Sequence, residues 1–136
     1  MKLKILTFIF FILLISCKAQ TNDKDIINIL KKTVESSQFQ NYLYPEIENR
    51  NILFLVKNEY MNSDIKMDIN NIDKFIVTEK EKIKGDNYML LKHFYITEKN
   101  KAIIVLYYKI ENIEVKSNLI KKYDEWVIEN IDIIEF

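Results

Sequence analysis

The C-terminal third of the chain constrains the fold most, because it holds four segments rich in β-branched and aromatic residues. These segments are Tyr88–Thr97, Ala102–Ile110, Ile113–Lys122 and Trp126–Phe136. The polar breaks between them are only two to four residues long. Breaks of this length suit antiparallel neighbours and exclude a parallel crossover, which needs about a dozen residues or more. The sequence therefore predicts a four-stranded antiparallel meander.

Alternation along these segments assigns side chains to the two faces of the sheet. In the second segment, every other residue from Ala102 to Ile110 is expected on one face. In the last segment we expect one face to carry Trp126, Ile128, Ile134 and Phe136, and the other to carry Val127, Ile131 and Ile133. Apolar residues on both faces indicate a strand that is covered on both sides, or a dimer face.

The residues before the meander predict one helix and three shorter strands. The stretch 23–38 is typical of a helix, because Ile26, Ile27, Leu30 and Val34 recur at helical spacing. Strands are expected at Ile52–Val56, around residues 65–69 and at Phe75–Thr78. One N-terminal helix packed on a curved antiparallel sheet is an α+β plan.

Part of the meander resembles a known type of domain. The run from Ala102 to Tyr108, the lysine-rich strand that ends Lys121-Lys122-Tyr123 and the segment Trp126-Val127-Ile128 are similar to the C-terminal hairpin of cystatin-like and NTF2-like domains. The resemblance implies a cone in which a helix packs in the concave face of a strongly bent sheet. The chain has fewer apparent helices than a full NTF2-like domain, which favours the simpler cystatin-like cone.

The N-terminus is typical of an export signal. Two lysines precede an apolar run from Ile5 to Ile15, which is shorter than the ~20 residues that a membrane-spanning helix needs. The motif Leu14-Ile15-Ser16-Cys17 resembles the lipobox of bacterial lipoproteins. That resemblance implies cleavage before Cys17 and a lipid on its thiol, and this lipid would anchor the protein to the membrane.

Three parts are therefore expected: a signal peptide at 1–16, a lipidated cysteine with a short tether at 17–22, and a single α+β domain at 23–136. Cys17 is the only cysteine, so its lipidation leaves no thiol for a disulfide or a nucleophile. Removing the two lysines of the signal from the 20 basic side chains leaves 18 against 20 acidic ones. That balance gives no reason to expect nucleic-acid binding. Lysine follows Cys17, and no acidic cluster does, which favours an outer-membrane anchor that faces the periplasm.

The candidates for a pocket or a partner surface are the only histidine, His93, together with Tyr95, Tyr107, Tyr108 and Trp126. Tyrosine suits both places, because it combines apolar area with a polar tip. Trp126 is also expected in the core, with its indole N–H reaching a nearby carbonyl.

Catalytic chemistry is not indicated. Any Ser-His-Asp triad would have to use His93, which is expected mid-strand on one face with Leu91 and Tyr95. The spacing patterns of metal sites are absent, and a chain with a single glycine cannot build a glycine-rich phosphate loop. The carboxylates alternate with lysines, as on solvated strand faces. We therefore expect no enzyme activity, no metal and no cofactor.

Three functional interpretations remain open, in this order. The first is a lipid-anchored envelope protein whose small non-catalytic domain binds a protein or a small ligand. The second is an immunity-type protein that neutralises a toxin, a role that the resemblance alone suggests. The third is an NTF2-like enzyme or a carrier of hydrophobic ligands that uses a pocket inside the cone.

Overall fold

A computed structural model describes residues 23–98 and 100–136 of the chain. The signal segment, Cys17 and the tether at 17–22 lie outside the described residues. The helices are α2 (Asp23–Val34), α3 (Ser37–Gln40) and the short 3₁₀ helix η1 (Lys80–Lys82). The strands are β1 (Ile52–Val56), β2 (Ile65–Ile69), β3 (Ile72–Thr78), β4 (Tyr88–Glu98), β5 (Lys101–Tyr108), β6 (Ile113–Lys122) and β7 (Glu125–Glu135).

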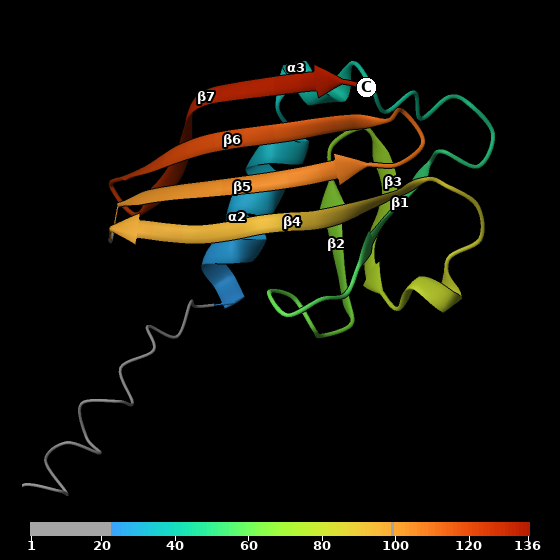
Figure 1. Cartoon of the computed structure of the whole chain (residues 1–136), viewed down its shortest axis with the longest axis horizontal. Coiled ribbons are helices and arrows are strands. Elements are labelled where there is room, and N and C mark those ends of the chain that lie inside the picture. The colour runs from blue at the N-terminus through green and yellow to red at the C-terminus, as the bar shows by residue number, and fades with distance from the viewer. Residues whose placement is uncertain (1–22, 99) are drawn as a thin grey trace, which may run out of the picture.

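All seven strands form one curled sheet in the order β2-β3-β1-β4-β5-β6-β7. The predicted meander is confirmed, because each of β4 to β7 pairs antiparallel with the next. In Figure 1 these four long strands lie side by side, and β1, β2 and β3 run crosswise to them. The α+β class is confirmed, with the sheet as the dominant part.

The expectation of a wholly antiparallel sheet is wrong at β1, which lies between β3 and β4 and runs parallel to both. A parallel pair needs a long connection. Residues 57–71, which include β2, provide that connection between β1 and β3. The short breaks near the C-terminus exclude parallel pairs only there, so the sheet is mixed.

The predicted helix at 23–38 is in fact two helices. Helix α2 ends at Val34, and Ser36 then has an extended backbone with φ −61° and ψ 141°. The Oγ atom of Ser36 accepts a hydrogen bond from the backbone N–H of Phe39 and so caps α3. The chain turns here because a serine cap starts a new helix, although apolar spacing continues through the region.

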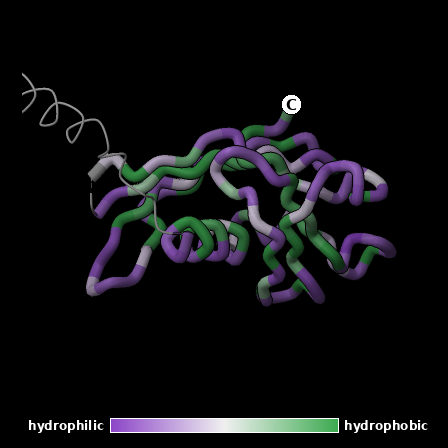
Figure 2. Tube along the Cα trace, turned by 90° about the horizontal axis from the view of Figure 1, so that it is seen from below, coloured by the Kyte–Doolittle hydropathy of each residue, from purple (hydrophilic) through white to green (hydrophobic). Residues whose placement is uncertain are grey.

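The core lies between α2 and the concave face of the sheet. Ile29, Leu30 and Val34 of the helix are completely buried, and so are Leu55, Ile104 and Leu106 of the strands. Figure 2 shows α2 beneath the sheet, with hydrophobic residues on the elements that face each other. Burial of one such side chain contributes roughly 1.5–3 kcal/mol. The concave side of the sheet is thus filled by the protein's own side chains.

The faces of β7 differ from the sequence expectation in its second half. The pairing of β6 with β7 skips Glu129, which is the extra residue of a β-bulge. One extra residue exchanges the faces beyond it, because side chains alternate along a strand. Ile131 and Ile133 therefore pack against the core, whereas Ile134 and Phe136 are 53% and 71% exposed.

Candidate functional site

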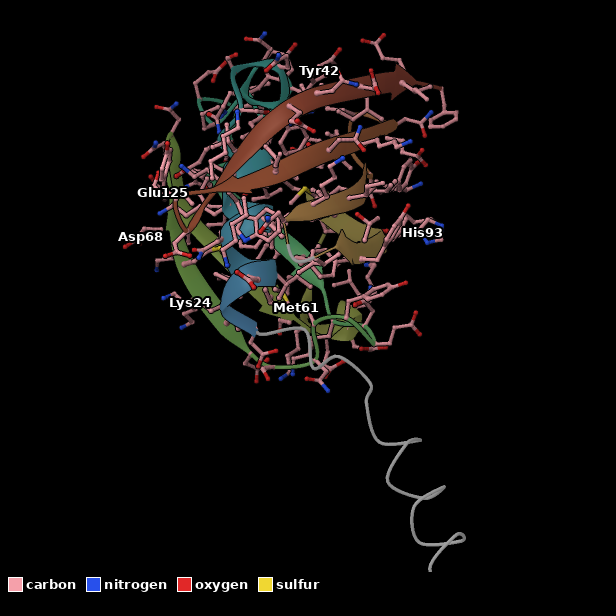
Figure 3. All side chains as sticks on the ribbon, turned by 90° about the vertical axis from the view of Figure 1, so that its left-hand side faces the viewer. Lys24, Tyr42, Met61, Asp68, His93 and Glu125 are labelled. Atoms are coloured by element: carbon pink, nitrogen blue, oxygen red, sulfur yellow. The ribbon has the colours of Figure 1, made fainter. Side chains whose placement is uncertain are left out.

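The structure divides the five candidate residues between the two faces of the sheet. Tyr108 and Trp126 are buried on the concave face. His93 and Tyr95 are exposed on the outer face, and Tyr107 is partly exposed there. Figure 3 shows His93 pointing away from the sheet on the side opposite α2. The five side chains therefore do not form a single pocket.

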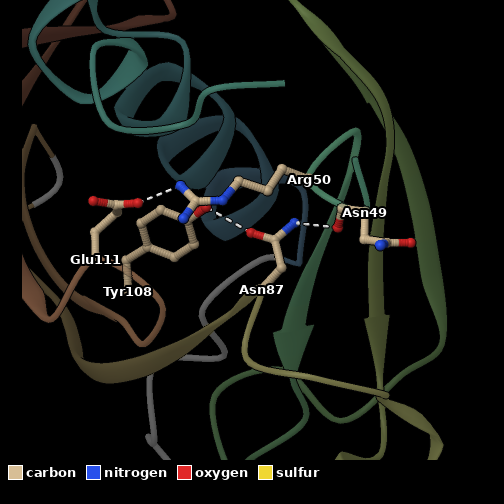
Figure 4. A network of polar contacts seen from close by, with 5 residues as sticks. All are labelled: Asn49, Arg50, Asn87, Tyr108 and Glu111. Carbon is tan, nitrogen blue, oxygen red and sulfur yellow. Dashed lines mark hydrogen bonds and ion pairs between the residues drawn. The ribbon is translucent and has the colours of Figure 1, made fainter. Parts of the chain in front are cut away.

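Tyr108 is held in a buried polar network (Figure 4). It has no exposed surface, and its hydroxyl donates to Oδ1 of Asn87 at 2.6 Å. Its ring meets Phe39 edge-on with centroids 5.7 Å apart. Burial raises the pKa of Tyr108 to about 12, with a smaller lowering effect of Arg50 and a raising effect of Glu111. A hydroxyl that is buried, bonded and protonated at neutral pH is suited to holding the core together rather than to proton transfer.

The rest of this network joins the loop before β1 to the sheet. Asn87 donates from Nδ2 to the carbonyl of Ile52 at 2.6 Å and to that of Asn49 at 3.5 Å. Arg50 is half-buried and donates to Glu111 in the β5–β6 turn. These contacts link positions far apart in the sequence, so no local pattern could have indicated them.

Trp126 is in the core as expected, but its hydrogen-bond acceptor is a carboxylate rather than a carbonyl. Its Nε1 donates to Oδ1 of Asp25 at 2.9 Å. The same oxygen accepts from Nζ of Lys121 at 3.3 Å, and that Nζ lies 5.5 Å from the centroid of the indole ring. This cluster attaches the first turn of α2 to the β6–β7 hairpin, which is a structural role.

Tyr107 also has a structural contact. Its hydroxyl donates to Oδ1 of Asn112 at 2.6 Å, and Asn112 donates to the carbonyl of Phe136. Asn112 has a left-handed backbone with φ 52° in the β5–β6 turn. The polar tip of Tyr107 is thus used to hold the turn, although the ring remains on the outer face.

His93 lies beside a second β-bulge, which changes the face it was predicted to share. The pairing of β4 with β5 shifts between Leu91 and His93, so Lys92 is the extra residue. Leu91 is therefore in the core, whereas Lys92 and His93 are both exposed. The expectation that His93 and Leu91 share a face is wrong for this reason, and the expectation for His93 and Tyr95 is confirmed. Bulges often re-aim side chains next to functional sites.

A hollow of about 370 Å³ lies on the outer face next to this bulge. Ile103 and Val105 of the central strand β5 supply apolar lining, and Tyr95, which is 50% exposed, adds an aromatic ring. The hollow is open to solvent and is shaped by three strands, so it suits a side chain or a short segment of a partner better than an enclosed small molecule.

The titratable side chains around the hollow are mostly basic. They are Lys92, His93 and Lys116, together with one carboxylate, that of Glu114. His93 lies opposite Val105, which in turn lies opposite Lys116, so a histidine and a lysine flank an apolar residue in one row. Within residues 23–98 and 100–136, none of these four side chains forms an ion pair. The polar ends of these side chains are therefore available to a ligand.

Other kinds of site receive no support from the described residues. No three His, Cys, Asp or Glu side chains gather there as a metal site would require. Within the same ranges, every helix is too short or too polar to span a bilayer. Comparison of the chain with protein families, with curated proteins and with solved structures finds no match.

Proposed function

We propose that the chain is a lipid-anchored envelope protein whose small domain binds a protein partner without catalysing a reaction. The binding surface in this proposal is the outer-face hollow of β4, β5 and β6. The observation that carries the proposal is the group of unpaired charges around an apolar lining, at a bulge that turns both Lys92 and His93 outward.

The filled concave side supports binding on the outside rather than inside the cone. The helix side chains Ile29 and Leu30 occupy the space that an NTF2-like pocket would need. Tyr108, the most deeply buried tyrosine, already bonds to Asn87. A carrier or an enzyme that uses the cone would have to displace these groups. The interpretation as an NTF2-like enzyme or carrier is therefore the least supported of the three.

The chemistry of the hollow defines the partner. Two lysines and one histidine outweigh the single carboxylate of Glu114. Ile103, Val105 and Tyr95 offer contact area to an apolar side chain. The partner is therefore an acidic protein segment that carries an exposed aliphatic or aromatic residue. A toxin with such a segment would make the immunity-type role one case of this proposal.

The anchor and the finer fold belong to the same proposal. The signal-like N-terminus and the lipobox motif ending at Cys17 support export and lipidation, and Lys18 after it favours the outer membrane facing the periplasm. The helix in the concave face of a curled sheet supports a relation to cystatin-like or NTF2-like domains. The parallel strand β1 departs from the antiparallel sheet expected of such domains, and a relation to them has to account for it.

A site-specific crosslink in the native bacterium tests the binding surface. A photo-reactive phenylalanine analogue replaces Tyr95 at the hollow, and a matched variant carries it at the fully exposed Tyr123 of the β6–β7 turn. We expect a protein adduct of defined mass from position 95 only, and its loss when Lys92→Glu and Lys116→Glu are added. Equal adducts from both positions, or an adduct that survives the charge reversal, would refute this surface.

A second measurement separates binding of a protein from carriage of a small molecule. Native mass spectrometry of the purified protein is expected to give the mass of the lipidated mature chain, with no further molecule bound. A retained apolar molecule, together with no adduct from position 95, would favour the carrier interpretation instead.

A further inference from the structure

Strand β7 leaves one edge of the sheet unpaired. It is the last strand in the order, is 11 residues long and contains no proline, glycine, lysine or arginine. Native edge strands are protected from the addition of another strand by short length, lysine, proline, bulges or inward-pointing charges. Of these devices β7 has only the bulge at Glu129 and the inward-facing Glu135, so its outermost residues remain open to pairing. In Figure 1 β7 runs along the outer border of the meander over its whole length.

The backbone groups that face outward can be assigned from the turn at Asn112. The N–H of Phe136 donates to the carbonyl of Asn112 at 3.1 Å, so Phe136 points its backbone groups toward β6. Backbone direction alternates along an antiparallel strand. Ile131, Ile133 and Glu135 therefore point their N–H and C=O groups away from β6. Within the described residues, none of these groups has a hydrogen-bond partner.

The side chains along this edge leave apolar surface on both faces. On the concave face Ile128, Ile131 and Ile133 pack against the core but remain only partly buried. On the outer face Val127 and Ile134 are 41% and 53% exposed. One additional strand would cover both sets at once, because its own side chains would alternate between the faces.

The negative charge of β7 favours one kind of added strand over others. The acidic side chains are Glu125, Glu129, Asp132 and Glu135, and β7 has no basic one. Pairing β7 with the β7 of a second copy would bring eight carboxylates together, and like charges across strands are destabilising. The basic side chains of a strand with lysine or arginine at alternate positions would instead lie on the outer face, where they would form favourable pairs with Glu125 and Asp132. Glu135 lies on the concave face, and its Oε1 atom accepts a hydrogen bond from the hydroxyl of Tyr42 at 2.7 Å.

We propose that the β7 edge binds an extended, basic segment of another protein as an eighth strand of the sheet. The segment alternates apolar residues, which complete the burial of the partly covered isoleucines, with lysine or arginine residues. This mode of recognition uses backbone hydrogen bonds for affinity and side chains for specificity. The edge adjoins the outer-face hollow, because Lys116 of the hollow lies opposite Asp132 of β7, but it takes a partner of the opposite charge.

Amide exchange with a synthetic strand tests this inference. The probe is the peptide Lys-Val-Lys-Ile-Thr-Val-Lys-Ile-Lys, added to the full chain in detergent, with hydrogen–deuterium exchange followed by NMR. The amides of Ile131, Ile133 and Glu135 are expected to exchange at least tenfold more slowly in the complex. The amides of Asp132 and Ile134, which already face β6, are expected to change little.

Three controls distinguish strand addition from simple charge attraction. Two peptide variants serve as controls: one is N-methylated at the backbone amides along both of its edges, and the other has glutamate in place of every lysine. Each is expected to bind at least tenfold more weakly than the probe peptide. Glu129→Lys at the bulge should weaken binding, whereas Glu81→Lys in η1 should not, because η1 lies far from β7 (Figure 1).

Several results would overturn the proposal. Equal binding of the N-methylated peptide would mean that charge alone attracts it. Unchanged exchange at Ile131, Ile133 and Glu135 with saturating peptide would exclude the edge. A concentration-dependent dimer in sedimentation, with the same three amides protected, would show that a second copy occupies the edge instead.

Discussion

Replacing Tyr108 by phenylalanine is expected to destabilise the domain at neutral pH. The change removes the hydroxyl that donates to Asn87 at 2.6 Å in a site without solvent exposure. Asn87 is 6% exposed, so its Oδ1 atom would be left without a donor. Leaving one buried acceptor unsatisfied costs about 1–3 kcal/mol. For a domain of this size that loss lowers Tm by roughly 3–15 °C, which calorimetry resolves easily.

The same hydroxyl makes the stability of the domain depend on alkaline pH. The pKa of Tyr108 is raised from 10.0 to about 12, chiefly because burial disfavours the phenolate. In the unfolded chain the phenol ionises near its ordinary pKa. The stabilisation is therefore fully present below pH 10 and is lost as the pH rises through 12. At ~1.4 kcal/mol per pKa unit, the ceiling of this effect is about 2–3 kcal/mol.

Urea unfolding between pH 8 and pH 12 measures both the stability lost in Tyr108→Phe and its dependence on alkaline pH. The stability advantage of the native chain over Tyr108→Phe is expected to shrink as the pH rises above 10. Tyr107→Phe is the matched control, since its hydroxyl lies on the neighbouring residue and bonds to the exposed Asn112. It should change stability by well under 1 kcal/mol and keep the alkaline dependence. Parallel profiles for the native chain and Tyr108→Phe would refute the reasoning.

Three further changes test other parts of the structure. The hydroxyl of Ser117 is completely buried without a hydrogen-bond partner in the described residues, so Ser117→Ala should leave stability unchanged or raise it by up to about 1 kcal/mol in urea unfolding. A clear loss of stability would reveal a partner for that hydroxyl. Asp25→Ala removes the acceptor of the Trp126 indole and should cost about 1–3 kcal/mol, followed by tryptophan fluorescence, whereas the exposed Asp23→Ala should cost far less. Cys17→Ser should abolish the mass increase that a lipid on the thiol gives the chain in intact-mass spectrometry, and a mass increase that persists would contradict lipidation at Cys17.

The candidate site could be predicted only in part. Aromatic and histidine content pointed to His93 and Tyr95, which do lie together at the hollow. The same criterion selected Tyr108 and Trp126, which are buried on the other face. Composition cannot separate these groups, because an aromatic residue suits a core and a binding surface equally well. The sequence around Lys92 and Lys116 does not mark them as site residues, because they come to the same hollow only through the pairing of β4, β5 and β6.

The sequence by itself determined the antiparallel order of β4 to β7, because the breaks between those strands are too short for any other connection. It also determined that a helix with one apolar stripe precedes the sheet. Only the tertiary structure decided the place of β1, since a long connection is compatible with many neighbours. The bulges at Lys92 and Glu129 were likewise decided by packing against the neighbouring strands. Each moves the following side chains to the other face, and so sets which residues reach the outer surface.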